Sequence, residues 1–216
     1  MLRRAGVLLS GCGLYDGSEV GETVLLLLAL DRAGARVEPM APDAPQCDVV
    51  DHASATVVEG VSRNILTESC RLVRGRVTDL RHARPEVLDA LFLPGGYGAA
   101  KNLLTGFAQP GRRRELAPGV AELLSHFLSE RKPIGVVSLA ETLLAAALGE
   151  PLREDPFSLP ATELRIDEER NIVFTSGFLG SERVSEVATG IEKMVAEVLD
   201  RSGRTRPSKA TPGKDS

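Results

Sequence analysis

Short apolar runs alternate with amphipathic segments along most of the chain. Apolar runs of a few residues predict buried strands at 5–10, 35–40, 90–93 and 134–137. Apolar residues spaced three or four positions apart predict helices at 19–33, 61–74, 120–128, 141–148 and 182–199. Residues 162–166 and 171–175 are joined by Asp-Glu-Glu-Arg, a pattern typical of a β-hairpin.

The order of these elements indicates the fold class. Strands that alternate with helices favour a mostly parallel sheet with helices on both faces, the doubly wound α/β class. Residues 1–200 are therefore predicted to form a single domain, which is long enough to bury a substantial core. From Arg201 onward the chain contains mainly Arg, Ser, Thr, Pro, Lys and Gly, which predicts a disordered polar tail at 201–216.

Composition narrows the range of partners and locations. Of the 216 residues, 43% are hydrophobic and 26% are charged, and a net charge of −4 favours neither nucleic acid nor a membrane surface as a partner. Cys12, Cys47 and Cys70 lack the spacing of metal ligands, so we expect reduced thiols and neither a disulfide framework nor a metal site. The apolar run near the N-terminus spans about four residues, which is shorter than a secretory signal core, and we expect a cytoplasmic protein.

Three loops that follow predicted strands contain the candidate chemistry, at residues 10–19, 94–102 and 137–141. In a parallel α/β sheet such loops meet at the carboxyl edge, where ligands bind. Gly95 and Gly96 are suited to point backbone N–H groups into an oxyanion site, although a tight turn between strand and helix explains them equally well. The first loop has neither a dinucleotide-binding nor a Walker spacing of glycines, and we expect no cofactor.

Ser138 ends the last of the four apolar runs, and a predicted helix begins directly after it. Such a turn between strand and helix often holds a nucleophile. A serine hydroxyl needs a neighbouring general base, however, and neither a histidine nor a Gly-x-Ser-x-Gly motif accompanies Ser138. The three histidines lie in unrelated segments, which leaves Glu22, Glu141 and Lys101 as candidates. A carboxylate is a poor base for an alcohol unless burial raises its pKa.

Four longer motifs occur in a fixed order: VLLSGCGLYDGSEVGE, APDAPQCDVVDH, SRNILTESCRLVRG and FLPGGYGAAKNL. With these motifs the chain resembles the ElbB-type branch of the ThiJ/PfpI superfamily from about residue 7 to residue 199, most clearly up to Leu104. The resemblance implies a class I glutamine-amidotransferase-like fold, which is flavodoxin-like in outline. It also implies cofactor-free glyoxalase chemistry, in which a cysteine thiolate adds to glyoxal or another 2-oxoaldehyde and water releases a hydroxy acid. Because this superfamily commonly forms homodimers, we expect self-association, with a small carbonyl compound as the ligand.

The resemblance also implies roles for individual positions. Glu22 matches a buried acid that contacts the nucleophile, and Ser138 occupies the position of the nucleophilic cysteine. Gly95 and Gly96 match the backbone oxyanion loop. The same loops provide six candidate substrate-binding residues: Cys12, Glu19, Tyr97, Lys101, Asn102 and Leu139.

The chain departs from the family pattern around this pocket. Besides the change from cysteine to Ser138, Glu141 replaces a proline and Gly21 replaces a histidine. The late Thr-Thr-Pro motif reads Thr-Ser-Gly at 175–177, and the segment 151–161 is shorter than in relatives. We therefore expect a catalytically degenerate protein that serves small-molecule binding, sensing or association. The alternative is an active glyoxalase-like or hydrolase enzyme that acts on 2-oxoaldehydes through Ser138.

Overall fold

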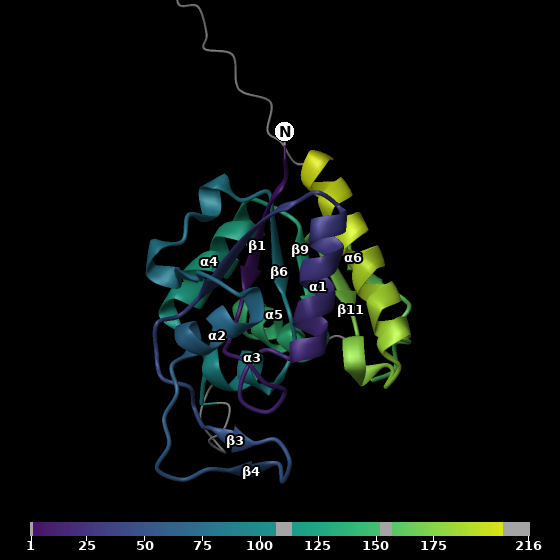
Figure 1. The fold of residues 1–216 in the computed structure, drawn as a ribbon. Helices are drawn as coiled ribbons and strands as arrows, with labels where there is room; N and C mark the ends of the chain where they lie inside the picture. Colours follow the sequence, from purple (N-terminus) through teal and green to yellow (C-terminus); the bar gives the residue numbers. More distant parts are fainter. Residues whose placement is uncertain (1, 107–113, 152–156, 205–216) are drawn as a thin grey trace, which may run out of the picture.

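A computed structural model describes residues 2–106, 114–151 and 157–204 (Figure 1). Within these ranges a central sheet contains seven strands in the order β10-β11-β9-β6-β1-β2-β5. Its strands are β1 (Arg4–Leu8), β2 (Arg36–Ala41), β5 (Thr78–Asp79), β6 (Ala90–Leu93), β9 (Ile134–Val137), β10 (Arg165–Asp167) and β11 (Ile172–Thr175). The strands from β11 to β5 pair in parallel, and the edge strand β10 pairs antiparallel with β11, as the hairpin prediction requires.

Helices cover both faces of this sheet, which confirms the doubly wound α/β class. One face carries α1 (Val20–Arg32), α2 (Ile65–Val73) and α6 (Val184–Arg204), and the other carries α3 (Tyr97–Asn102), α4 (Pro118–Ser129) and α5 (Glu141–Leu148). α1 and α6 lie side by side (Figure 1). The short 3-10 helices are η1 (Leu80–His82), η2 (Pro85–Val87), η3 (Ser138–Ala140) and η4 (Gly177–Leu179). No helix within the described ranges combines the length and the apolar content needed to cross a bilayer.

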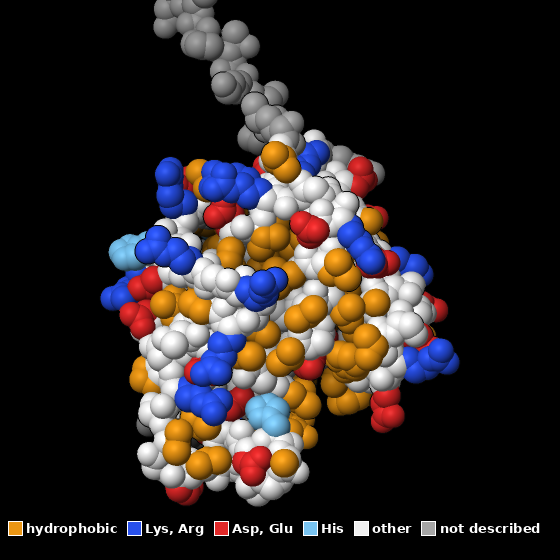
Figure 2. All heavy atoms as spheres, viewed as in Figure 1, with side chains coloured by type: hydrophobic (Ala, Val, Ile, Leu, Met, Phe, Trp, Pro, Cys, Tyr) orange, Lys and Arg blue, Asp and Glu red, His pale blue; other side chains and the backbone are white. Residues whose placement is uncertain are grey.

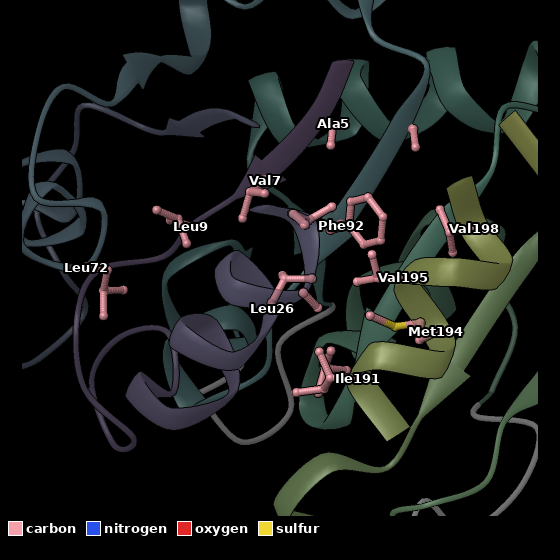
Figure 3. Packing of buried hydrophobic residues seen from close by; sticks show 14 of the residues in the cluster. Ala5, Val7, Leu9, Leu26, Leu72, Phe92, Ile191, Met194, Val195 and Val198 are labelled. Atoms are coloured by element: carbon pink, nitrogen blue, oxygen red, sulfur yellow. The ribbon is translucent and has the colours of Figure 1, made fainter. Parts of the chain in front are cut away.

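The pleat of the strands sends alternate residues to the two helix layers. Val136 of β9 packs with the core under α4 and α5, whereas Val137 packs with the core under α1 and α6. In the second of these cores the buried ring of Phe92 lies among side chains such as Leu26 of α1 and Val195 of α6 (Figure 3). Burial on both faces explains why the central strands are continuous apolar runs in the sequence.

Side-chain caps set the starts of the first two helices. Glu19 caps α1, because its carboxylate accepts a hydrogen bond from the Glu22 N–H at 2.5 Å. The helix begins at Val20, directly after Glu19. The Asn64 side chain accepts a hydrogen bond from the Thr67 N–H at 3.0 Å. α2 therefore starts at Ile65 rather than at residue 61, where the spacing of apolar residues predicted it.

The last helix extends into the predicted polar tail. α6 ends at Arg204, so the prediction of disorder is wrong for residues 201–204. Arg201 pairs with Glu168 and Glu197, and the buried Ser202 hydroxyl donates a hydrogen bond to the Leu199 carbonyl. These polar contacts hold the last turn of the helix although it has few apolar residues. The rest of the predicted tail lies outside the described residues.

Two short hairpins were not predicted. β3 (Val50–Asp51) pairs antiparallel with β4 (Thr56–Val57), and β7 (Leu104–Thr105) pairs antiparallel with β8 (Glu115–Leu116). Strands of two residues are too short to show a periodic pattern, so the sequence does not reveal them. The β3–β4 hairpin lies near α3, beyond the carboxyl end of β1 (Figure 1).

Candidate functional site

The loops after β1 and β6 are held together by backbone hydrogen bonds at the carboxyl edge of the sheet. The Glu19 N–H donates to the Gly95 carbonyl at 2.9 Å, and the Tyr97 N–H donates to the Leu14 carbonyl at 2.8 Å. The N–H of Gly98, in the first turn of α3, donates to the Gly17 carbonyl at 3.0 Å. The parallel topology thus brings these two loops together, as the sequence predicted.

Three glycines make this close approach sterically feasible. A Cβ atom on Gly98 would lie 2.3 Å from the Gly17 Cα, and one on Gly96 would lie 2.5 Å from the Gly17 carbonyl oxygen. Gly96 also has a φ of +100°, a value that other residues rarely adopt. Any side chain at Gly96 or Gly98 would therefore push the two loops apart.

Ser138 follows β9 and is held in a left-handed conformation, with a φ of +55°. For a residue with a side chain this conformation costs about 1–2 kcal/mol, so packing in the folded protein must maintain it. The side chain is buried, and Ser138 as a whole is only 4% exposed. The turn between strand and helix thus has the strained geometry expected of a position that presents a nucleophile.

Glu22 lies beneath this turn and is completely buried, with 0% of its surface exposed. Its Oε2 atom accepts a hydrogen bond from the Gly95 N–H at 3.1 Å, and its Oε1 atom accepts one from the Phe178 N–H at 3.0 Å. The Ser138 side chain also forms a hydrogen bond with the carboxyl group. The loops after β6, β9 and β11 therefore converge on one acid from the first turn of α1.

Burial raises the pKa of Glu22 to about 8, because no water solvates its charged form. The nearby Glu19 carboxylate also raises this pKa, while hydrogen bonds with Phe178, Gly95 and Ser138 lower it in part. At pH 7 the Glu22 side chain is therefore mostly a neutral carboxylic acid. In this state it donates one hydrogen bond and does not take a proton from a neighbour.

Gly95 and Gly96 do not contribute equally to an oxyanion site in this structure. The Gly95 N–H already donates to Glu22, whereas the Gly96 N–H donates to none of the residues that the structure describes. A Cβ atom on Gly95 would lie 2.5 Å from Glu22 Oε2 and 2.9 Å from Ser138 Oγ. Gly95 thus packs against both the acid and the serine. Of the two glycine amides, only that of Gly96 remains for a ligand.

Lys101 and Asn102 contact the scaffold rather than an open site. The Lys101 ammonium group pairs with the Asp48 carboxylate at 2.8 Å, and both side chains are largely buried. The Asn102 amide group donates to the carbonyls of Ser10 and Asp16, at 2.7 and 2.9 Å. These contacts fix the loop after β1 and the segment that leads to β3, and the substrate-binding role of Lys101 and Asn102 stays a prediction. The pairing with Asp48 also argues against Lys101 as a base for Ser138.

Glu141 is likewise unsuited to activate Ser138, and the Cys12 thiol is itself a weak nucleophile. One Glu141 carboxylate oxygen forms an ion pair with Arg165 of β10, in a mostly buried position. Burial raises the pKa of the half-buried Cys12 thiol, and the Glu68 carboxylate raises it further, although Arg71 opposes this effect. A thiol with a raised pKa is mostly protonated at pH 7 and reacts slowly.

The other predicted ligand contacts lie at the rim of the site. Tyr97 is exposed, and its ring centroid is 6.1 Å from that of Tyr15, which in turn lies 5.2 Å from the His52 ring. Leu139 is half-buried in η3, directly after Ser138. Glu19 is occupied by capping α1. Across the described parts of the chain, no three His, Cys, Asp or Glu side chains are grouped closely enough to hold a metal ion.

Phe178 is the contact that sequence reasoning missed. It follows Gly177 in η4, just beyond the buried strand β11, and reaches Glu22 through its backbone N–H. Its ring also covers Gly21, where a Cβ atom would lie 2.9 Å from the Phe178 Cε2 atom. The one local signal for this contact in the sequence was Gly177, which comes just after the buried strand β11. This strand ends at the same edge of the sheet as β1, β6 and β9.

Comparison with known proteins places this fold and site in a family. No family model matches the chain. The human glutamine amidotransferase-like class 1 domain-containing protein 3, mitochondrial, is 36% identical over 226 aligned positions, which cover 93% of this chain and 84% of the human protein. The chain belongs to this glutamine amidotransferase-like class 1 family. The rat ES1 protein homolog, mitochondrial, is 35% identical to this chain. The alignment covers 93% of this chain and 85% of the rat protein.

Solved structures agree with this family assignment. An isoprenoid biosynthesis protein with an amidotransferase-like domain from Ehrlichia chaffeensis matches with a TM-score of 0.83 and 31% identity, over 91% of this chain and 99% of that protein. Drosophila melanogaster DJ-1beta matches with a TM-score of 0.54 and 16% identity, over 95% and 96% of the two chains, which shows a shared fold alone. The family member described here therefore has the α/β fold of the ThiJ/PfpI and DJ-1 proteins, as its sequence motifs predicted.

The predicted cytoplasmic location is contradicted by the same comparisons. The human, rat and zebrafish relatives all have names that describe them as mitochondrial. The prediction rested on the short apolar run near the N-terminus, and this criterion tests only for a secretory signal. Mitochondrial transit peptides are recognised by an amphipathic, Arg-rich composition instead, so a short apolar run is no evidence against them.

Proposed function

We propose that this chain is an ElbB-like family member that binds a small carbonyl compound at the Ser138 site without turning it over at neutral pH. The observation that supports this proposal most strongly is the pairing of Ser138 with Glu22, whose pKa is raised to about 8. A neutral acid at this position suits a cysteine thiolate, because it donates a hydrogen bond to the negative sulfur. The same neutral acid is the wrong partner for a serine, whose hydroxyl must lose its proton to a base.

Other side chains near the loops do not replace the missing base. Glu141 is paired with Arg165, and Lys101 is paired with Asp48. Of the histidines, His52 contacts Tyr15 and His126 contacts Lys132 and Phe127, while His82 is exposed in η1. A serine without a base remains a hydrogen-bonding group, so the site is suited to hold a ligand rather than to attack it.

The ligand class follows from the groups that remain. A carbonyl oxygen is an acceptor, and the Gly96 N–H is a donor that bonds to none of the described residues. The burial of Ser138, at 4% exposure, restricts a ligand that touches it to a small molecule.

A binding titration tests this step: hydroxyacetone, a stable carbonyl compound, is added to 15N-labelled protein. We expect saturable shifts at the Gly96 and Leu139 amides that are lost in Ser138→Val and kept in the surface control Ser185→Val. Unchanged Gly96 and Leu139 signals in the wild type would argue against carbonyl binding.

The second candidate function is a glyoxalase-like enzyme that works only at alkaline pH. Above about pH 8 Glu22 becomes a carboxylate in hydrogen-bond contact with Ser138, and a base with a pKa near the working pH is well matched to proton transfer. Ser138 Oγ would then add to the aldehyde carbon of a 2-oxoaldehyde as its proton passes to Glu22, forming a tetrahedral alkoxide. Transfer of this proton from Glu22 to the alkoxide oxygen would give a hemiacetal.

A glyoxal-to-glycolate assay from pH 6 to pH 9 separates the two functions. If the chain only binds the carbonyl compound, we expect the wild type and Ser138→Ala to give the same rate of glycolate formation at pH 7. A rate that only the wild type shows, and that rises through about pH 8, would establish the enzyme instead. We also expect Ser138→Cys to give little or no activity, because Glu141 has changed the pocket as well; robust activity in this variant would show that the rest of the site is intact.

A further inference from the structure

The β3–β4 hairpin contacts the loop after β1 through the Val50 N–H and through a histidine, His52. Its ring Nδ1 lies 3.1 Å from the Val50 carbonyl, and its Nε2 accepts a hydrogen bond from the Tyr15 N–H at 3.3 Å. These two contacts require a neutral imidazole with its proton on Nδ1, because Nε2 must have a free lone pair to accept from Tyr15. The structure therefore shows the uncharged form of the His52 side chain.

A buried carboxylate lies beside the same ring nitrogen. Asp16 is 0% exposed, and its Oδ2 accepts a hydrogen bond from the Val50 N–H at 2.9 Å. Its Oδ1 has no hydrogen-bond partner among the described residues, and the nearest cationic candidate is His52 Nε2 at 3.8 Å. A buried acceptor without a partner is unfavourable, so a donor at this position would stabilise the loop.

Gly13 leaves the space in which the acid and the ring lie side by side. A Cβ atom on Gly13 would lie 2.5 Å from Asp16 Oδ1 and 2.7 Å from His52 Nε2. Because of this gap, a movement of the ring by about an ångström brings Nε2 into hydrogen-bond range of Oδ1. That movement lengthens the contact with the Tyr15 N–H, and a protonated Nε2 has no lone pair with which to keep it.

We propose that His52 is a proton-operated latch between the β3–β4 hairpin and the loop after β1. In the neutral form Nε2 accepts from the Tyr15 N–H; in the protonated form the Nε2–H donates to Asp16 Oδ1 and the Tyr15 N–H is released. Histidine is suited to this role because its side chain gains and loses a proton more readily near neutral pH than other side chains do. The groups that face His52 are Asp16 and Tyr15 from the loop, and Asp51 from its own hairpin.

The latch reaches the rim of the Ser138 site through aromatic contacts. The Tyr15 ring lies between the His52 ring and the Tyr97 ring, with centroid distances of 5.2 and 6.1 Å. Tyr97 begins α3, directly after Gly96, and its N–H is bonded to the Leu14 carbonyl next to Tyr15. Protonation of His52 is therefore expected to move Tyr15 relative to Tyr97 at the rim of the site.

The test is an NMR titration of 15N-labelled full-length protein between pH 5 and pH 8. We expect the Tyr15 amide signal and the His52 ring signals to titrate with one midpoint, and the His52 Nε2 signal to change from an acceptor to a protonated nitrogen. In His52→Gln the Tyr15 amide should lose this titration, whereas the control His82→Gln, which changes an exposed histidine in η1, should keep it. A Tyr15 amide that does not titrate, or that titrates equally in His52→Gln, would overturn the proposal.

A second variant tests the role of the acid. Asp16→Asn removes the negative charge that stabilises a protonated His52, and we expect the midpoint of the His52 titration to fall by about one pH unit, a tenfold loss of proton affinity. A midpoint that stays within about 0.2 pH units of the wild type would show that Asp16 is not the partner. Asp16 is buried, so where this variant fails to fold, the comparison of His52→Gln with His82→Gln decides the question alone.

Discussion

The backbone N–H of Gly95 donates a hydrogen bond of 3.1 Å to Oε2 of Glu22, an acid that lies 73 residues earlier in the chain. This bond joins the loop after β6 to the first turn of α1, directly beneath Ser138. It also occupies an amide that the family resemblance implies for an oxyanion. The site therefore uses one of its two candidate donors to hold the buried acid in place.

The raised pKa of Glu22 predicts a pH-dependent stability. The folded state keeps a proton on Glu22 up to about pH 8, whereas the unfolded chain releases it at the ordinary pKa of glutamate. Between about pH 5 and pH 8 the folded state binds more protons, so the free energy of unfolding falls as pH rises, by about 1.4 kcal/mol per unit from this group. Urea unfolding of the wild type and Glu22→Gln at pH 5, 6, 7 and 8 measures this slope. We expect the slope of the variant to be less negative by this amount, and equal slopes would contradict the buried, protonated acid.

Gly95→Ala should destabilise the protein through crowding alone. The new Cβ atom would lie 2.5 Å from Glu22 Oε2 and 2.8 Å from the Ser138 Cβ, and both of these side chains are buried. We expect a loss of about 1–3 kcal/mol in the free energy of unfolding, with loss of hydroxyacetone binding. Gly75→Ala is the matched control, because its nearest contact is 3.8 Å away, and it should change stability little. A Gly95→Ala variant as stable as this control would show that Glu22 and Ser138 can separate.

The Cys12 thiol should react slowly with alkylating reagents, although it lies in a loop. Burial and the Glu68 carboxylate raise the pKa of its thiol, so little thiolate is present at pH 7. We expect alkylation by iodoacetamide, followed by mass spectrometry, to be slower at Cys12 than in the urea-unfolded chain, and to accelerate with pH. Glu68→Gln should increase the rate, while Glu38→Gln in β2 should not. Labelling faster than in the unfolded chain would mark Cys12 as an activated thiol after all.

We expect the interface of the predicted dimer to lie on the exposed side of α1. Val20, Val24 and Leu28 recur every fourth residue and are 41–49% exposed, and hydrophobic side chains gather over this helix (Figure 2). We expect light scattering to show a dimer, and Val24→Lys to shift the protein toward the monomer at equal concentration. Val57→Lys on β4 is the control, because Val57 is equally exposed on the β3–β4 hairpin. A monomeric wild type, or equal effects of both substitutions, would exclude this face as the interface.

The sequence predicted the sheet well because its central strands are buried on both faces. β6 and β9 are continuous apolar runs, and both were predicted at their observed bounds. The convergence of Glu22, Gly95 and Ser138 also followed from the sequence, since motif resemblance and the carboxyl-edge rule point to the same loops. β3 and β4 were missed because two-residue strands have no periodicity.

The roles of individual polar side chains were harder to predict. Lys101 and Asn102 lie in the last turn of α3, where a contact with the scaffold and a contact with a ligand need the same residue types. Only their partners, such as Asp48, distinguish the two kinds of contact. The bond between Phe178 and Glu22 spans 156 residues and uses a backbone N–H, which leaves no trace in the amino-acid type. Such contacts depend on tertiary packing, which local patterns do not describe.

The close packing of Gly17, Gly96 and Gly98 has a consequence for how this family can diverge. A Cβ atom on Gly96 or Gly98 would meet the backbone of the loop after β1, and one on Gly17 would meet the backbone of Gly11 and Cys12 in its own loop. A substitution at any of the three glycines therefore requires a change in the loop after β1. Ser138 and Glu141, where the motif resemblance implies a cysteine and a proline, lie outside this glycine contact. The contact between the loops does not depend on the side chains at these two positions, so the reactive group at this turn can change without a new backbone.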